Sequence, residues 1–202
     1  ARSTESATAI EGRDPFDGTG RLWLAGAALS QEVAGDPASG RKLAGQCRTC
    51  HGIEGAAKMP AAPSIGGEPA SFLASQLTAF RSGTRQNEMM SVVAAALSDQ
   101  QIADLAAWYS SQTAVATLTA DPSGAPESCV SCHGVDGMGM DDDTPDLAGE
   151  NSIYLLSQLK AFRQGSRPSE IMQPIAESLD DDQMRAAAEW YASVKLEIAK
   201  PE

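Results

Sequence analysis

Aromatic residues, cysteines, histidines and long apolar stretches are all scarce in this chain of 202 residues. Phenylalanine, tryptophan and tyrosine make up only 5% of it, so ordinary side chains alone would fill the interior of a domain poorly. The longest apolar run, residues 22–29, is far shorter than the ~20 residues that a membrane-spanning helix requires, so no membrane span is expected. This run follows an acidic, glycine-rich lead unlike an intact signal peptide, and we expect the chain to be a mature form.

Basic side chains are also in short supply, since 15 lysines and arginines face 27 aspartates and glutamates. The resulting net charge of −12 disfavours nucleic acid as a partner. Most of this charge lies in residues 118–202, which hold 16 acidic and 6 basic side chains, including three consecutive aspartates at 141–143 and again at 180–182. This acidic excess is either an ordinary solvated surface or an electric dipole that steers the molecule toward a basic partner.

Cysteine and histidine are rare, and their placement is the most informative feature of the chain. The four cysteines and two histidines all belong to two copies of the pattern Cys-x-x-Cys-His. Two such thiols can add across the vinyl groups of one haem, and the histidine that follows can bind the iron from one face. The sequence therefore predicts two covalent haem c groups. The residues concerned are Cys47, Cys50 and His51 in the first copy, and Cys129, Cys132 and His133 in the second.

Two other uses of paired cysteines fit the sequence less well. Two Cys-x-x-Cys pairs can hold one structural zinc ion. Such pairs usually lie about 15–20 residues apart, whereas Cys50 and Cys129 are separated by the length of a whole domain. A thioredoxin-like redox pair requires a βαβ context, and no strand-like alternation surrounds either pattern.

The second half of the chain repeats the first with an offset of 82 positions, without a gap from the haem pattern to the last helix. Two repeats are too few for a solenoid, which needs about three stacked units, so we interpret them as a duplicated domain. We expect an amino-terminal extension over residues 1–35, one domain over 36–115 and a second over 118–200. The matched pairs include Cys47 with Cys129, Pro63 with Pro145, Glu68 with Glu150, Gln76 with Gln158, Arg85 with Arg167, and Trp108 with Trp190.

The repeat also selects the sixth ligand of each iron. No histidine remains outside the two haem patterns, so a methionine thioether is the expected donor. Of the seven methionines, only Met90 and Met172 are related by the offset. Met89 corresponds to Ile171, and we expect it to be a packing or surface residue. Most of the unmatched methionines, which include Met59, Met138 and Met140, are expected to fill gaps in a core.

Local signals predict helices throughout. Capping-box patterns, with a polar cap residue three positions before a glutamine, open the last helix of each repeat at Ser98 and Asp180. In the first repeat, the middle helix should begin at Pro69 and end at Gly83, which are a favourable first residue and C-terminal cap. The predicted helices cover residues 69–83 and 98–109 in the first domain, and 152–165 and 180–191 in the second.

The segments that lead to the two haem patterns differ. Asp36 and Pro37 start a helix that leads to Cys47, whereas Pro126 should shorten the helix that leads to Cys129. Residues 113–121 are interpreted as the link between the domains.

Pro63 and Pro145 each lie 12 residues after a haem histidine. Either each is a simple turn proline, or its carbonyl accepts a hydrogen bond from the ring N–H of the ligating histidine. The second role would fix the orientation of the imidazole.

Together, these features resemble the cytochrome c4 family over about residues 36–197. The resemblance is carried by the two haem patterns, the Gln-Leu-x-x-Phe-Arg-x-Gly-x-Arg helix end and the final Leu-Ser-Asp-Gln-x-Ile-x-x-Leu-Ala-x-Trp-Tyr. It implies an all-α protein of two tandem class I cytochrome c domains, each a small helical bundle around one covalent haem, related by a pseudo-twofold axis. It also implies a bacterial periplasmic location, soluble or peripherally associated with the membrane. The implied axial pairs are His51 with Met90, and His133 with Met172. Residues 1–35 and the acidic segment 138–143 depart from the family pattern.

The leading functional hypothesis is a dihaem electron carrier that is not an enzyme. It would take one electron per haem from a quinol-oxidising complex or a dehydrogenase and pass it to a terminal oxidase. An iron bound by histidine and methionine has no open position, and methionine raises its reduction potential. The different charges of the two domains suggest two unequal potentials.

Two alternatives remain open. The chain is either a carrier or a dihaem subunit permanently bound to a dehydrogenase, with residues 1–35 as a docking arm. A dihaem peroxidase is less favoured because it needs an open haem. A thiosulfate-oxidising cytochrome typically needs a further cysteine ligand, and no spare cysteine exists in this sequence.

Overall fold

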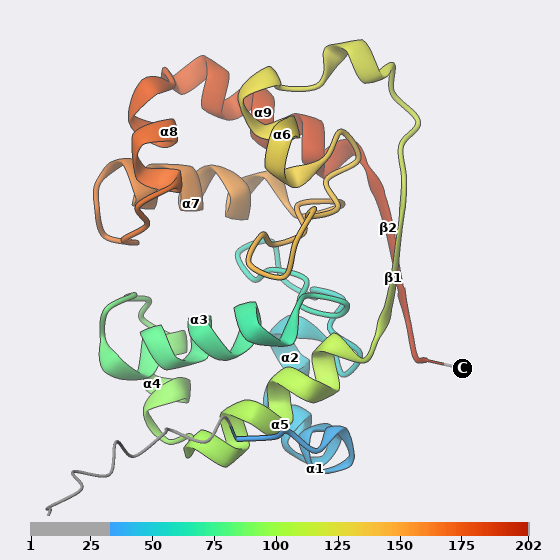
Figure 1. Cartoon of the computed structure of the whole chain (residues 1–202), viewed down its shortest axis with the longest axis vertical. Helices are drawn as coiled ribbons and strands as arrows, with labels where there is room; N and C mark the ends of the chain where they lie inside the picture. Colours follow the sequence, from blue (N-terminus) through green and yellow to red (C-terminus); the bar gives the residue numbers. More distant parts are fainter. Residues whose placement is uncertain (1–32, 202) are drawn as a thin grey trace, which may run out of the picture. The chain divides into compact units, whose positions relative to one another are not determined.

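The computed structural model describes residues 33–201, and the account of the fold is confined to them. Almost all of the predicted amino-terminal extension, residues 1–32, lies outside the described residues, and so does its expected role as a docking arm. The described part is mostly helical, as predicted, and forms two groups of helices (Figure 1).

The first group places its haem pattern at the end of a short helical run. Helix α5 packs against α1 and α3, and α3 packs against α4. Their shared core contains Leu73, Leu105 and Trp108. Gly83 ends α3 with a φ of 80°, which confirms its predicted role as a cap. The elements are α1 (Pro37–Leu43), the 3₁₀ turn η1 (Ala44–Gln46), α2 (Arg48–His51), α3 (Ala70–Ser82), α4 (Met90–Ala95) and α5 (Asp99–Ser110).

The second group has the same plan with a shorter approach to its haem pattern. Pro126 precedes the first residue of α6, so it shortens this helix as expected. Helix α7 packs against α8 and α9. The buried apolar residues of this group form two clusters, one around Leu155 and Tyr191 and one around Phe162 and Met184. The elements are the 3₁₀ turn η2 (Pro122–Gly124), α6 (Glu127–His133), α7 (Ser152–Arg163), α8 (Met172–Ser178) and α9 (Asp181–Ser193).

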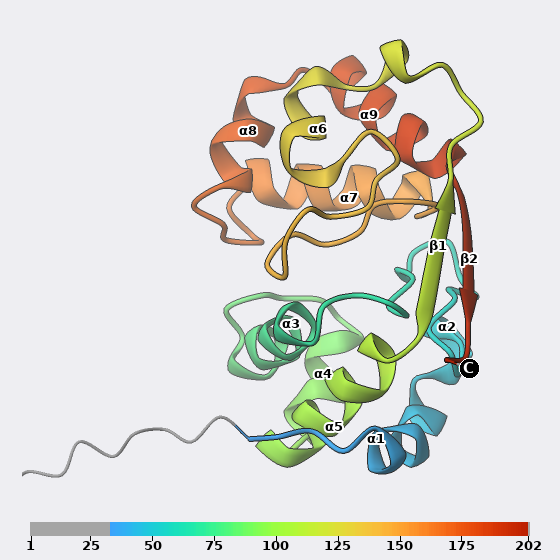
Figure 2. The same ribbon diagram turned by 45° about the vertical axis from the view of Figure 1, so that its right-hand side comes forward.

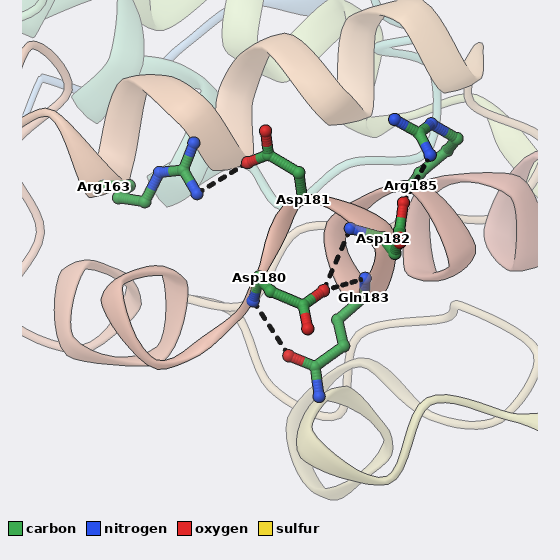
Figure 3. A network of polar contacts seen from close by, with 6 residues as sticks. All are labelled: Arg163, Asp180, Asp181, Asp182, Gln183 and Arg185. Atoms are coloured by element: carbon green, nitrogen blue, oxygen red, sulfur yellow. Dashed lines mark hydrogen bonds and ion pairs between the residues drawn. The ribbon is translucent and has the colours of Figure 1, made fainter.

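The aspartate run at 180–182 is built into the start of α9 (Figure 3). The Asp180 carboxylate accepts hydrogen bonds from the backbone N–H groups of Asp182 and Gln183, and the Gln183 side chain accepts one from the Asp180 N–H at 2.9 Å. This is the predicted capping box, and Ser98 forms its counterpart at α5. The other two carboxylates form ion pairs with arginines: Asp181 with Arg163 at 2.8 Å, and Asp182 with Arg185 at 2.7 Å.

A two-stranded sheet adds to the helices that the sequence predicted. Strand β1 (Thr113–Thr117) pairs antiparallel with β2 (Lys195–Ala199), so the segment interpreted as a link joins the end of the chain. Figure 2 shows the two strands side by side. A Cβ on Gly149 would meet Leu196 and one on Gly66 would meet Ile198, so β2 packs closely against both helical groups. Among the described helices, none is both long and apolar enough to cross a membrane.

Candidate functional site

The two haem patterns lie at the C-terminal ends of equivalent helices. His51 is the last residue of α2 and His133 the last residue of α6. The next residue is a glycine with a positive φ in both cases, 74° at Gly52 and 70° at Gly134. A side chain at these positions would strain the backbone. The chain therefore turns sharply directly after each histidine.

The last helix of each group holds the backbone that follows the haem pattern. In the first group, the Trp108 indole N–H donates to the Ile53 carbonyl at 2.8 Å. In the second, the Trp190 indole N–H donates to the Val135 carbonyl at 3.0 Å. The neighbouring tyrosine hydroxyls donate to the carbonyls of the two glycines described above. The final Trp-Tyr pair of each repeat thus fixes the position of the haem pattern.

Both histidine rings are held by the prolines that the sequence singled out. His51 Nδ1 lies 2.8 Å from the Pro63 carbonyl oxygen, and His133 Nδ1 lies 2.9 Å from that of Pro145. A carbonyl only accepts hydrogen bonds, so Nδ1 carries the proton in each ring and the Nε2 lone pair is free. This confirms that each proline carbonyl accepts a hydrogen bond from the histidine ring, so the prolines are more than simple turn residues.

The electrostatic setting of the histidines suits a metal ligand. His51 and His133 are 8% and 6% exposed. Burial lowers the pKa of both rings, against the opposing effect of the proline carbonyls. Each imidazole is therefore neutral near pH 7, which is the form that binds iron.

The two methionines selected by the repeat occupy equivalent positions. Met90 is the first residue of α4 and Met172 the first residue of α8, and both are partly buried. Their predecessors point outward, since Met89 is 63% exposed and Ile171 is 69% exposed. Met89 is therefore a surface residue, in agreement with the sequence-based expectation.

The expectation that unmatched methionines fill a core is wrong for two of them. Met59 is 48% exposed and Met140 is 70% exposed. Both lie in the loops between a haem pattern and its proline, where no apolar cluster covers them. Met184, by contrast, is fully buried in the second group.

The cysteines fit haem attachment better than a zinc site. None of the four forms a disulfide. Burial raises the pKa of the Cys47 and Cys129 thiols. Over residues 33–201, no group of three or more histidine, cysteine or acidic side chains is arranged to hold a metal ion.

Two arginines each form hydrogen bonds with both helical groups. Arg85 donates to Gln76 at 2.6 Å and to Gln158 at 2.7 Å, while Arg167 donates to Gln158 at 2.9 Å and to Gln76 at 3.2 Å. Each guanidinium thus contacts the glutamine of its own repeat and that of the other. This reciprocal exchange is what a pseudo-twofold relation produces. Sequence reasoning matched these residues in pairs but did not predict that they meet.

The same arginines suit a cofactor that brings negative charge. Arg85 is only 9% exposed, and neither guanidinium forms an ion pair within the described part of the chain. Burial and the neighbouring Arg85 lower the pKa of Arg167 to about 10. Two buried cations without carboxylate partners favour anionic groups. The haem propionates are such groups, so the residues present fit haem c.

Comparisons with known proteins agree with this geometry. The family model described as "Cytochrome c" matches residues 124–195, and the model "Cytochrome C oxidase, cbb3-type, subunit III" matches residues 35–108. The fold and the site therefore define a c-type cytochrome of two domains that carries two covalent haem c groups.

Relatives that align with both domains narrow the class of c-type cytochromes to one family. The chain is 37% identical to the "Thiosulfate dehydrogenase electron acceptor" of Stutzerimonas stutzeri, an alignment that covers 85% of this chain and 94% of that protein. It is 32% identical to "Cytochrome c4" of Pseudomonas aeruginosa, over 78% of this chain and 88% of that protein. The crystal structure of reduced cytochrome c4 from Pseudomonas stutzeri superimposes with a TM-score of 0.71 at 28% identity, covering 80% of this chain and 100% of that one. The chain belongs to the cytochrome c4 family of dihaem electron-transfer proteins.

Proposed function

We propose that this chain is a periplasmic electron carrier that accepts electrons from a thiosulfate-oxidising dehydrogenase and delivers them to a terminal oxidase. The observation that carries the choice of donor is the 37% identity to a thiosulfate dehydrogenase electron acceptor over 94% of its length. Joining two thiosulfate ions through a new S–S bond gives tetrathionate and releases two electrons. A carrier with two haems can take up both electrons, one at each iron.

The proposed haem sites follow the repeat. In the first domain, Cys47 and Cys50 hold the porphyrin and His51 and Met90 bind the iron. In the second domain, Cys129 and Cys132 hold it and His133 and Met172 bind the iron. Support comes from the matched environments of these residues, above all the two Nδ1 contacts with the proline carbonyls.

Bound haem c supplies an iron that cycles between the ferric and ferrous states. The protein keeps each histidine neutral and correctly turned, because the proline carbonyl fixes the proton on Nδ1 and leaves Nε2 free. The methionine thioether raises the potential. If His51 with Met90 and His133 with Met172 hold the two irons, they would leave no open ligand position for peroxide or another substrate.

The donor is tested by stopped-flow reduction of the oxidised holoprotein with thiosulfate and a purified thiosulfate dehydrogenase. We expect both haems of the chain to be reduced, and no reduction when either thiosulfate or the dehydrogenase is omitted. The parallel assay replaces this donor with a quinol-oxidising complex. Efficient reduction by that complex alone, in protein that ascorbate reduces fully, would contradict the proposed donor.

A second candidate is a permanent subunit of the dehydrogenase, because the same relative is named as the electron acceptor of that enzyme. A carrier and a permanent subunit differ in how tightly they bind the dehydrogenase. Size-exclusion chromatography of extracts from native cells separates them. A carrier elutes at its own mass of 21.0 kDa, whereas a subunit elutes with the dehydrogenase.

A further inference from the structure

Glu68 and Glu150 are two buried carboxyl groups to which the preceding description assigns no role. They occupy equivalent positions in the two repeats and are 5% and 4% exposed. Neither forms an ion pair with a basic side chain of residues 33–201. A buried carboxylate that forms no ion pair is costly, so the contacts that these two groups do make are informative.

Each carboxyl group faces the backbone of the other domain. Glu68 Oε2 accepts a hydrogen bond from the Asp146 N–H at 3.2 Å. Position 64 is equivalent to position 146, and there the backbone N–H of Ser64 faces Glu150. This second contact is the looser one, because Oε2 of Glu150 is buried and accepts no hydrogen bond.

The two N–H groups belong to the peptide units that hold the haem histidines. The peptide unit between Pro145 and Asp146 donates its N–H to Glu68, and its carbonyl accepts the Nδ1–H of His133 at 2.9 Å. The equivalent unit between Pro63 and Ser64 accepts the Nδ1–H of His51 at its carbonyl, and its N–H faces Glu150, which the N–H of Asn151 also faces. A relay thus runs from the carboxyl group of one domain, through a single peptide unit, to the imidazole of the other.

Charge at one end of this relay is felt at the other. Hydrogen bonds in a chain polarise one another, and more strongly in a buried setting. Negative charge beside the peptide N–H increases electron density on the carbonyl oxygen, which strengthens the bond from Nδ1–H. The imidazole then becomes a more basic ligand. A more basic ligand stabilises ferric iron relative to ferrous iron and lowers the reduction potential.

We propose that each glutamate is a positioning residue that sets the reduction potential of the haem in the opposite domain. Glu68 acts on the iron bound by His133, and Glu150 acts on the iron bound by His51. The inference rests on the haem assignment given under Proposed function. Glu68 has the larger effect, because it accepts its hydrogen bond directly.

The relay makes both potentials depend on pH. Burial raises the pKa of Glu68 well above its usual 4.5 and that of Glu150 to about 8. Three charged groups face Glu68: Asp146, Arg167 and Glu150. Asp146 also faces Glu150. As the pH rises, the glutamates lose their protons and place negative charge beside the two N–H groups. Both potentials therefore fall with rising pH, until the glutamates are fully ionised.

The test is an optical redox titration of the holoprotein at pH 6 and pH 9, with Glu68→Gln and Glu150→Gln. Glutamine keeps an acceptor oxygen and the side-chain shape but cannot carry the charge. Each variant is also made in a Met90→His or a Met172→His background, which lowers the potential of one haem by removing its thioether. The remaining high-potential wave then reports a single haem. Glu189→Gln, which removes an exposed charge from α9, is the control.

We expect each substitution to change the potential of the haem in the other domain. At a pH at which Glu68 is ionised, Glu68→Gln raises the potential of the second haem, with about a threefold higher ferrous-to-ferric ratio at a fixed ambient potential, within the range of a single hydrogen bond. It leaves the first haem close to the control. Glu150→Gln does the reverse with a smaller effect, and at pH 6 both variants approach the wild-type protein. Shifts confined to each variant's own domain, or no larger than in the control, would overturn the proposal.

A second measurement does not depend on the redox titration of either haem. The backbone amide resonance of Asp146 should titrate with pH in the wild-type protein, and Glu68→Gln should remove the part of this titration that does not come from the Asp146 carboxyl group itself, whose pKa burial also raises. An unchanged titration in the variant would show that Glu68 is not the group sensed by this peptide. Neither measurement uses a dehydrogenase, so failure of the proposed donor would leave both results intact.

Discussion

Met89 and Met90 are sequence neighbours with different environments, and this contrast gives a direct test of ligation. Met90 is partly buried at the start of α4, whereas Met89 is 63% exposed. Met90→Ala should therefore remove the far-red thioether band from one of the two ferric haems and lower its potential. Met89→Ala should leave the spectrum and both potentials unchanged. The absorption spectrum of the oxidised protein decides between them, and loss of the band in the Met89 variant would exclude Met90 as the ligand.

The buried Glu150 predicts how stability depends on pH. Its pKa is raised to about 8 in the folded protein because of burial, so the folded state binds a proton that the unfolded state releases above about pH 4.5. The unfolded state thus binds fewer protons between these values, and this group lowers the free energy of unfolding as the pH rises, by at most ~1.4 kcal/mol per pH unit. Glu150→Gln should flatten this part of the profile, as measured by chemical denaturation of the holoprotein from pH 5 to pH 9. A profile identical to that of the wild type would be inconsistent with the raised pKa.

Single residues were predictable where the repeat supplied a matching partner and a local chemical reason. The proline carbonyls follow from their constant spacing after the histidines, and the structure places both within hydrogen-bond distance. The roles of Glu68 and Arg85 were not predictable in this way. Their partners come from the other domain, and a sequence offset states which positions are equivalent but not which positions touch.

At the level of elements, the tight contact between α1 and α5 depends on a glycine. A Cβ on Gly40 would overlap the backbone of Asp104 and the Trp108 side chain, so the two helices meet almost backbone to backbone. Gly40→Ala should destabilise the holoprotein by about 1–3 kcal/mol through overpacking. Gly45→Ala is the matched control, because nothing lies within 4 Å of its Cβ position. Equal stability of the two variants in chemical denaturation would contradict this packing.

Helix ends were predictable from sequence, whereas the sheet was not. Capping boxes at Ser98 and Asp180 and the terminating Gly83 depend on residues within one turn, so their patterns are visible locally. The strands 113–117 and 195–199 do alternate between outward and inward residues. Each is only five residues long, however, and its partner lies about 80 positions away. Residues 113–121 do connect the two helical groups, as interpreted, but their pairing as a strand was not predictable for this reason.

We expect the whole molecule to need its haems to complete the core. Each helical group is small, aromatic residues make up only 5% of the chain, and the buried apolar residues of the second group form two clusters joined through the partly buried Leu156. A variant with all four cysteines replaced by serine should therefore be at best partly folded. Far-ultraviolet circular dichroism should show reduced helix content and no cooperative thermal transition. A cooperative, native-like transition in this variant would refute the prediction.

The uneven charge of the chain has a partly structural origin. The aspartates at 180–182 cap α9 and pair with arginines (Figure 3), so this run is built into the fold. Asp141 in turn accepts a hydrogen bond from the Asp143 N–H within its own loop. The steering of a basic partner by the acidic domain stays a prediction, and the salt dependence of the rate of reduction measures it.

An optical redox titration of the holoprotein tests whether two irons are each bound by one histidine and one methionine. We expect two haems per chain, a thioether band from both ferric irons, and two one-electron waves of unequal potential. A single haem per chain, or a ferric haem without the thioether band, would contradict it.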